Sequence, residues 1–191
     1  MDQPEHQGVM FDETGEPTPI ERRYMPPGPT AFIGEDGGIR EFVEARDLDA
    51  GVTRLIEAHP KELALLRQLT IVCLWRAKGG KSNGKRVLGQ TKRLTGLERY
   101  LSGMMDDEPV DFVIWLAVDH LSYRSDNGIE AVLFHELCHI GADDKGKPCI
   151  VPHDWAGFAR EIELYGLHTE DARHVERAFR QTRMPMAGGA S

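Results

Sequence analysis

The sequence lacks several features that would assign it to a function class directly. It has three cysteines, Cys73, Cys138 and Cys149, with no paired spacing, which argues against a disulfide framework and favours a reducing compartment. Residues 1–13 are acidic and contain no apolar segment, so we expect no secretory signal. Apolar runs such as residues 113–118 are far too short to cross a bilayer. We therefore expect no membrane partner and a cytoplasmic location.

Positive charge is also scarce, and much of it lies in one segment. The chain has 23 Lys and Arg residues against 31 Asp and Glu residues, and its formal net charge of −8 does not favour nucleic acid or an anionic membrane. Residues 76–93 are the exception, because they contain seven basic residues and no acidic one. A solvated hairpin explains this run most simply. Contact with nucleic acid or an acidic partner is the weaker alternative, since the run is poor in aromatic residues.

Core-forming residues are sparse at both ends of the chain. Six of the eleven prolines fall within residues 1–43, together with many acidic residues and glycines. Such a stretch buries too little apolar surface to offset the entropy lost on ordering. The composition predicts a flexible Pro/Gly-rich acidic arm at residues 1–43, with order beginning near Phe42. A folded domain is expected at residues 44–183, followed by a loose tail at residues 184–191.

Periodicity predicts an α+β domain with a short antiparallel sheet packed on helices. The segment 48–69 has helical spacing interrupted by Pro60. A later helix is predicted with Asp126 as its N-cap, and another is expected to end at Gly166. The expected strands are residues 69–76, 86–94 and 110–119, and the later helices are residues 126–141, 153–166 and 169–182.

The sequence His-Glu-Leu-Cys-His at residues 135–139 is an HExxH motif within a predicted helix. Residues four apart lie one turn apart on one helix face, so His135 and His139 can reach the same ion. Glu136 is turned about 100° around the helix axis, so it flanks that ion instead of binding it. This arrangement predicts a Zn²⁺ site with a zinc-bound water activated by Glu136.

Two histidines alone do not hold a catalytic zinc, so a third ligand is required. Asp143 and Asp144 lie nearby, but their sequence is typical of a polar turn. Cys149 is better explained as a small, partly buried residue. His153 and Glu161 lie about 12 Å apart along the next predicted helix, so only one of them can bind. We favour His153 because imidazole is the better neutral ligand, and Glu161 is the alternative. Arg160 is expected to face solvent.

Three segments together resemble the phage metallopeptidase family and, more distantly, the SprT-like zincins. They read DFVIWLAVDHLSY, EAVLFHELCHI and HDWAGFAREIELYG, within a similarity that covers about residues 45–168. The resemblance implies a minimal zincin-like domain, zinc bound by His135, His139 and His153, and Glu136 as the catalytic base. SprT-like proteins usually have glycines beside the third histidine, whereas Pro152 precedes it here. They often carry a cysteine-rich zinc ribbon, and this chain lacks the cysteine pairs for one.

These observations predict a zinc-dependent metallopeptidase that acts on a protein or peptide substrate. One alternative is a catalytically silent, zinc-stabilised binding or virion component. Another is a nucleic-acid-associated SprT-like protease that uses residues 76–93. If a phage encodes the chain, the expected location is the host cytoplasm, with the virion as a second option.

Overall fold

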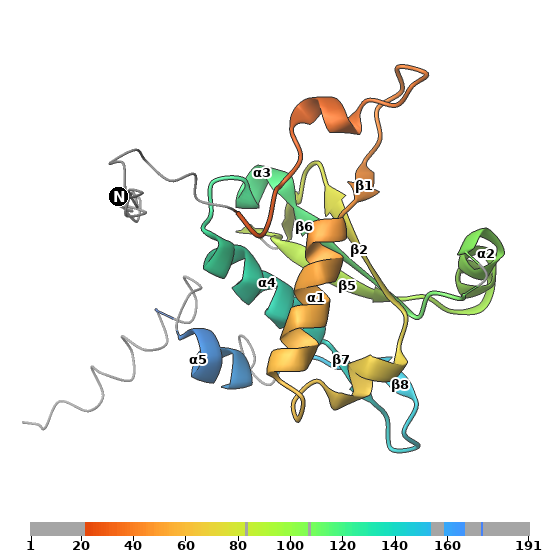
Figure 1. The fold of residues 1–191 in the computed structure, drawn as a ribbon, viewed down its shortest axis with the longest axis vertical. Coiled ribbons are helices and arrows are strands. Elements are labelled where there is room, and N and C mark those ends of the chain that lie inside the picture. Colours follow the sequence, from red (N-terminus) through yellow and green to blue (C-terminus); the bar gives the residue numbers. More distant parts are fainter. Residues whose placement is uncertain (1–21, 83, 107, 154–158, 167–172, 174–191) are drawn as a thin grey trace, which may run out of the picture.

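The structure is a computed structural model that describes residues 22–82, 84–106, 108–153, 159–166 and 173. The described chain forms a small sheet with helices around it (Figure 1). The elements are η1 (Pro29–Phe32), β1 (Phe42–Glu44), α1 (Arg46–Ala58), η2 (Ala64–Gln68), β2 (Ile71–Arg76), β3 (Lys81–Ser82), β4 (Lys85–Arg86), β5 (Gly89–Arg93), α2 (Gly96–Asp106), β6 (Phe112–Ala117), α3 (Val118–Leu121), α4 (Asp126–Cys138), β7 (Ile140–Ala142), β8 (Pro148–Ile150) and α5 (Ala159–Tyr165).

The main sheet has four strands in the order β1-β2-β6-β5. It is mixed, so the prediction of an antiparallel sheet was wrong: β2 and β6 are parallel, while β1 and β5 each pair antiparallel with a neighbour. Five of the six residues of β6 are buried, as suits a strand at the centre of a sheet. The strand β5 pairs with β6 and does not lie beside β2. The α+β class was predicted correctly.

Two helices, α1 and α4, pack together and contact the sheet (Figure 1). Alternating side chains of the two central strands supply the sheet's part of the core, and α4 supplies much of the rest. The core residues on these strands are Cys73, Trp75, Phe112, Ile114 and Leu116. Those on α4 are Ile129, Val132, Leu133, Phe134, Leu137 and Cys138. Because α4 is buried over so much of its length, its position relative to the sheet is closely constrained.

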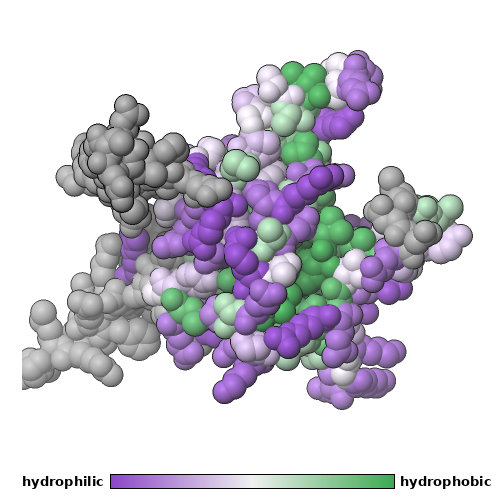
Figure 2. Space-filling model, in the orientation of Figure 1, coloured by the Kyte–Doolittle hydropathy of each residue, from purple (hydrophilic) through white to green (hydrophobic). Residues whose placement is uncertain are grey.

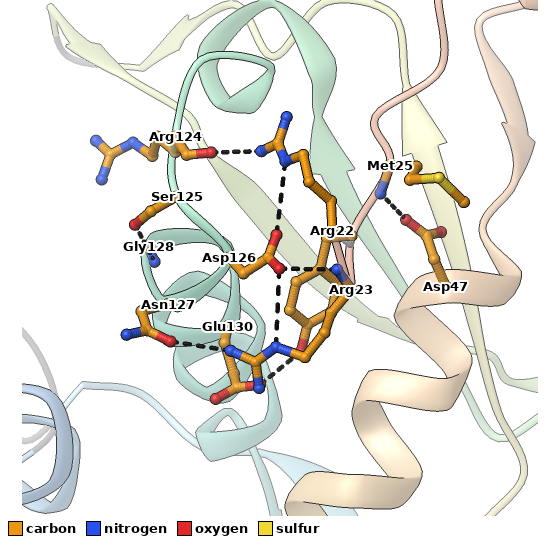
Figure 3. A network of polar contacts seen from close by, with 11 residues as sticks. Arg22, Arg23, Met25, Asp47, Arg124, Ser125, Asp126, Asn127, Gly128 and Glu130 are labelled. Carbon is orange, nitrogen blue, oxygen red and sulfur yellow. Dashed lines mark hydrogen bonds and ion pairs between the residues drawn. The ribbon is translucent and has the colours of Figure 1, made fainter. Parts of the chain in front are cut away.

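The segment before β1 packs against the domain, so order begins earlier than the predicted start near Phe42. Tyr24 is fully buried and donates a hydrogen bond of 2.9 Å to Glu130 of α4. Arg23 also binds Glu130, at 2.9 Å, and its main-chain N–H donates to Asp126 at 2.7 Å (Figure 3). Residues 1–21, 167–172 and 174–191 lie outside the described residues, so the arm before residue 22, the helix at residues 169–182 and the tail at residues 184–191 stay predictions.

The first turn of α4 differs from the prediction in its cap. Ser125, not Asp126, is the N-cap, and its hydroxyl accepts a hydrogen bond of 3.2 Å from the main-chain N–H of Gly128 (Figure 3). Asp126 lies one residue inside the helix, where its carboxylate binds the arginines of the N-terminal segment. A carboxylate in the first turn also interacts favourably with the helix dipole.

The helix α2 was not predicted, and it projects from the rest of the described structure (Figure 1). Its exposed apolar side chains are Leu97, Tyr100, Leu101 and Met104. Elsewhere the face shown in Figure 2 is mostly hydrophilic, with hydrophobic surface gathered in a band to the right of centre. None of the described helices is long and apolar enough to cross a membrane.

Gly51 allows α1, α4 and the N-terminal segment to approach closely. A Cβ atom at this position would lie 2.7 Å from a ring carbon of Tyr24 and 2.9 Å from a methyl group of Leu133. Both neighbours are fully buried, so neither can move away without disturbing the core.

We therefore expect Gly51→Ala to lower the free energy of unfolding by about 1–3 kcal/mol, despite the better helix propensity of alanine. Urea unfolding followed by circular dichroism measures this change. Gly128→Ala is the matched control, because a Cβ atom there would meet its nearest neighbour at an ordinary 3.4 Å. A stabilised Gly51→Ala protein would contradict this account of the packing.

Candidate metal centre

The end of α4 presents two histidines beside each other. His135 lies in the last turn of the helix, and His139 is its C-cap residue. Their ring centroids are 5.2 Å apart, as expected for side chains spaced four residues apart on one helix face. Phe134, Leu137 and Cys138 on the other sides of this turn are buried in the core. Packing of the helix therefore determines which way the two imidazoles point.

A short hairpin after α4 brings His153 back to the same place. The strands β7 and β8 pair antiparallel, and the main-chain N–H of Val151 donates a hydrogen bond of 2.8 Å to the carbonyl of His139. His153 follows two residues later, in neither a helix nor a strand. Because α5 is described from Ala159 onward and residues 154–158 lie outside the described part, the predicted helix start near His153 stays a prediction.

The three imidazoles form a group that can hold a metal ion. One ring nitrogen from each of His135, His139 and His153 lies within 4.8 Å of the corresponding nitrogens of the other two. The Nε2 atoms of His135 and His153 are 2.9 Å apart. Tetrahedral zinc ligands would be separated by roughly 3.3 Å, so the donors are already near the required spacing. Three neutral imidazoles are also a donor set that suits zinc.

The opposite ring nitrogens of two of these histidines have hydrogen-bond acceptors. Nδ1 of His139 lies 2.9 Å from the carbonyl oxygen of Val151, and Nδ1 of His135 lies 2.6 Å from a carboxylate oxygen of Glu161. A proton on Nδ1 leaves Nε2 with a lone pair for a metal. Burial lowers the pKa of His139, which favours its neutral form. Burial also lowers the pKa of His135, but the hydrogen bond and charge of Glu161 outweigh it, and the pKa is raised.

Glu136 is buried where α4 meets the strand β5. It is 4% exposed, and the hydroxyl of Thr91 lies 2.9 Å from its carboxylate and 2.7 Å from its main-chain oxygen. Gly89 leaves space for this carboxylate, since a Cβ atom there would lie 3.0 Å from Glu136 Oε1. Burial raises the pKa of Glu136 to about 7, against the opposing charge of His135. A carboxyl group in this environment suits proton transfer near neutral pH.

The other candidate ligands are not members of the group of three histidines. Among the described residues, the metal-binding group does not include Asp143, Asp144 or Cys149. Asp143 accepts main-chain hydrogen bonds within its own turn, as the polar-turn interpretation requires. Glu161 is a hydrogen-bond partner of His135 and is not a member of the group.

The prediction that Arg160 faces solvent was wrong. Its guanidinium donates to the carbonyl and the sulfur of Cys138, each at 3.1 Å. An arginine at the last turn of a helix satisfies carbonyls that have no partner within the helix and interacts favourably with its dipole. Arg160 thus holds α5 against the end of α4.

The partners of Glu136 and of the imidazoles were not identified from the sequence. Thr91 and Gly89 lie on the same face of β5, and the alternation of side chains along a strand could have indicated this. Their contact with α4 depends on the register between β5 and β6, which the sequence does not reveal.

The basic segment 76–93 offers no support for binding nucleic acid. Arg76 lies 4.5 Å from the ring centroid of Trp115 and forms an ion pair with Glu41. Lys92 forms another ion pair, at 2.6 Å, with Glu98. Part of the positive charge is therefore used within the fold.

A protein-family model matches most of the chain. The family model described as "Putative phage metallopeptidase" matches residues 40–183, which is most of the chain and includes all three histidines and Glu136. No curated protein matches, and neither does any solved structure. The matched range contains both the end of α4 and the hairpin that returns to it. The chain belongs to the putative phage metallopeptidase family.

Proposed function

We propose that the protein is a zinc-dependent metallopeptidase in which His135, His139 and His153 bind the ion and Glu136 is the catalytic base. The observation that carries this proposal is the convergence of three imidazole nitrogens within 4.8 Å, beside a buried glutamate. Three protein ligands leave a coordination position open, as catalytic zinc sites do. Membership of a metallopeptidase family supports the same function.

Glu136 has the environment that such a base requires. When bound, a zinc ion supplies Lewis acidity, which polarises a carbonyl and makes water a better nucleophile at neutral pH. Glu136 accepts a proton from the attacking water and then donates it to the leaving amine. Thr91 donates a hydrogen bond to the Glu136 carboxylate, which holds the carboxylate in position during both proton transfers. The raised pKa of Glu136 allows it to act in both directions.

The strand β5 is suited to hold an extended substrate. It forms one edge of the four-stranded sheet, and its residue Thr91 contacts Glu136. A peptide that adds to this edge gains main-chain hydrogen bonds independent of its sequence. Its backbone would then run past the carboxylate that performs the proton transfers. We infer that β5 is the binding edge for the peptide.

A purely structural zinc site would be arranged differently. Such sites close the fourth position with a protein ligand and have no use for a buried base. Among the described residues, the metal-binding group contains three histidines and no fourth residue. The buried carboxylate of Glu136 beside these ligands therefore favours catalysis over a silent binding role.

Glu136→Gln is expected to keep zinc and lose peptide hydrolysis. The amide has nearly the same shape but cannot accept the proton, so turnover should fall by at least about 100-fold. Zinc content is measured by elemental analysis, and turnover is measured with a library of quenched fluorogenic peptides. Glu57→Gln is the control, because Glu57 is exposed and lies on α1. Unchanged turnover in Glu136→Gln would exclude Glu136 as the base.

His153→Ala is expected to weaken zinc binding by more than about 100-fold, beyond the range typical of residues that only support a ligand. Competition with a chromophoric chelator measures the affinity. His120→Ala is the control, since the ring of His120 lies 3.3 Å from the carbonyl oxygen of Gly80 and outside the metal-binding group. Equal zinc affinities for the two variants would show that the third ligand lies elsewhere.

A further inference from the structure

A second carboxylate is buried behind the imidazole of His135. Among the described residues, Glu136 and Glu161 are the buried charged side chains, and Glu161 is 3% exposed. Burial of an ionised carboxylate is unfavourable unless a donor satisfies it. One donor here is Nδ1 of His135, 2.6 Å away and 26 residues earlier in the chain. A contact this short and this protected from water strongly constrains the imidazole.

We infer that Glu161 is a positioning residue that sets the metal affinity of His135. Glu161 contacts Nδ1, whereas Nε2 of the same ring lies 2.9 Å from Nε2 of His153, within the metal-binding group. Because Glu161 accepts a proton from Nδ1, it keeps Nε2 unprotonated and directed at the ion. It also makes the imidazole a stronger donor. This inference rests on the proposed metal site and assigns Glu161 a role other than that of a ligand.

The two ligands of α4 differ in how they are oriented. His139 donates to the main-chain carbonyl of Val151, a contact that no substitution at position 151 removes. Nδ1 of His135 instead contacts a side-chain carboxylate, that of Glu161. Substitution at position 161 therefore tests how the orientation of the His135 imidazole affects metal binding, because the imidazole itself is still present.

Arg160, the residue before Glu161, explains how Glu161 reaches this position. Its guanidinium binds the carbonyl and sulfur of Cys138 and also the carbonyl of Glu62, at 3.4 Å. These contacts anchor α5 to the end of α4. The fold consequently places Glu161 beside Nδ1 of His135 whether or not an ion is bound.

The test compares zinc affinity in Glu161→Ala and Glu161→Gln with the wild type, by chelator competition on the full chain. We expect Glu161→Ala to lose about 10–100-fold in affinity, as is typical when the partner of a ligating histidine is removed. Glu161→Gln keeps an oxygen that can accept from Nδ1, so it should lose less. Glu163→Ala is the matched control, because Glu163 lies on the same helix with its side chain exposed. Its affinity should not change.

The absorption spectrum of the cobalt-substituted protein distinguishes positioning from ligation. If Glu161 positions His135, the wild type and both variants keep the same ligand number and similar band intensities. A change in ligand number in Glu161→Ala would show that Glu161 binds the ion and would overturn the inference. So would unchanged zinc affinity in a folded Glu161→Ala protein, or a Glu161→Gln loss as large as that of alanine.

These measurements do not depend on peptide hydrolysis. If the variants follow the expected order of zinc affinity and the wild type cleaves no peptide, the role of Glu161 stands and the proposed peptidase activity fails. Thermal unfolding of the zinc-free variants provides the folding control. A role limited to stability would lower the melting temperature and leave zinc affinity, measured well below that temperature, unchanged.

Discussion

His135 and His139 lie one turn apart at the end of α4, so a third imidazole can join them only where the chain returns to that end. The hairpin of β7 and β8 makes this return. The main-chain hydrogen bond from Val151 to the carbonyl of His139 ties it to the helix. Val151 also accepts from the ring of His139 through its own carbonyl. Val151, just after β8, therefore contributes both to the path of the chain toward His153 and to the orientation of the His139 imidazole.

The position of α4 itself depends on contacts on several sides. Its apolar residues pack on the sheet and on α1, and Arg23 and Tyr24 bind Glu130 near its start. At its other end, Thr91 binds Glu136 and Arg160 binds Cys138. Each polar contact involves a buried or half-buried group, where a lost hydrogen bond is costly. The candidate metal centre thus lies at an end of α4 that several contacts hold in place, and its three imidazoles are close together without a bound ion.

Local patterns were enough to predict the elements that carry the motif. The strand before it, the buried helix, and the spacing of His135, Glu136 and His139 all depend on residues close in sequence. The parallel pairing of β2 with β6 and the helix α2 were not predicted. These features depend on which strands meet, and the sequence pattern alone does not determine that. The choice of His153 over Glu161 as the third ligand stays a prediction. It is supported by the contact of Glu161 with His135 and that of Arg160 with Cys138, neither of which was predicted from the sequence.

The most direct test of the central claim is X-ray absorption spectroscopy at the zinc edge of the zinc-loaded protein. Ligation by these three histidines predicts scattering from three imidazoles and none from sulfur, although Cys138 directly precedes His139 and Cys149 lies between His139 and His153. Two imidazoles, or any sulfur in the zinc coordination sphere, would contradict the assignment of His135, His139 and His153 as the ligands.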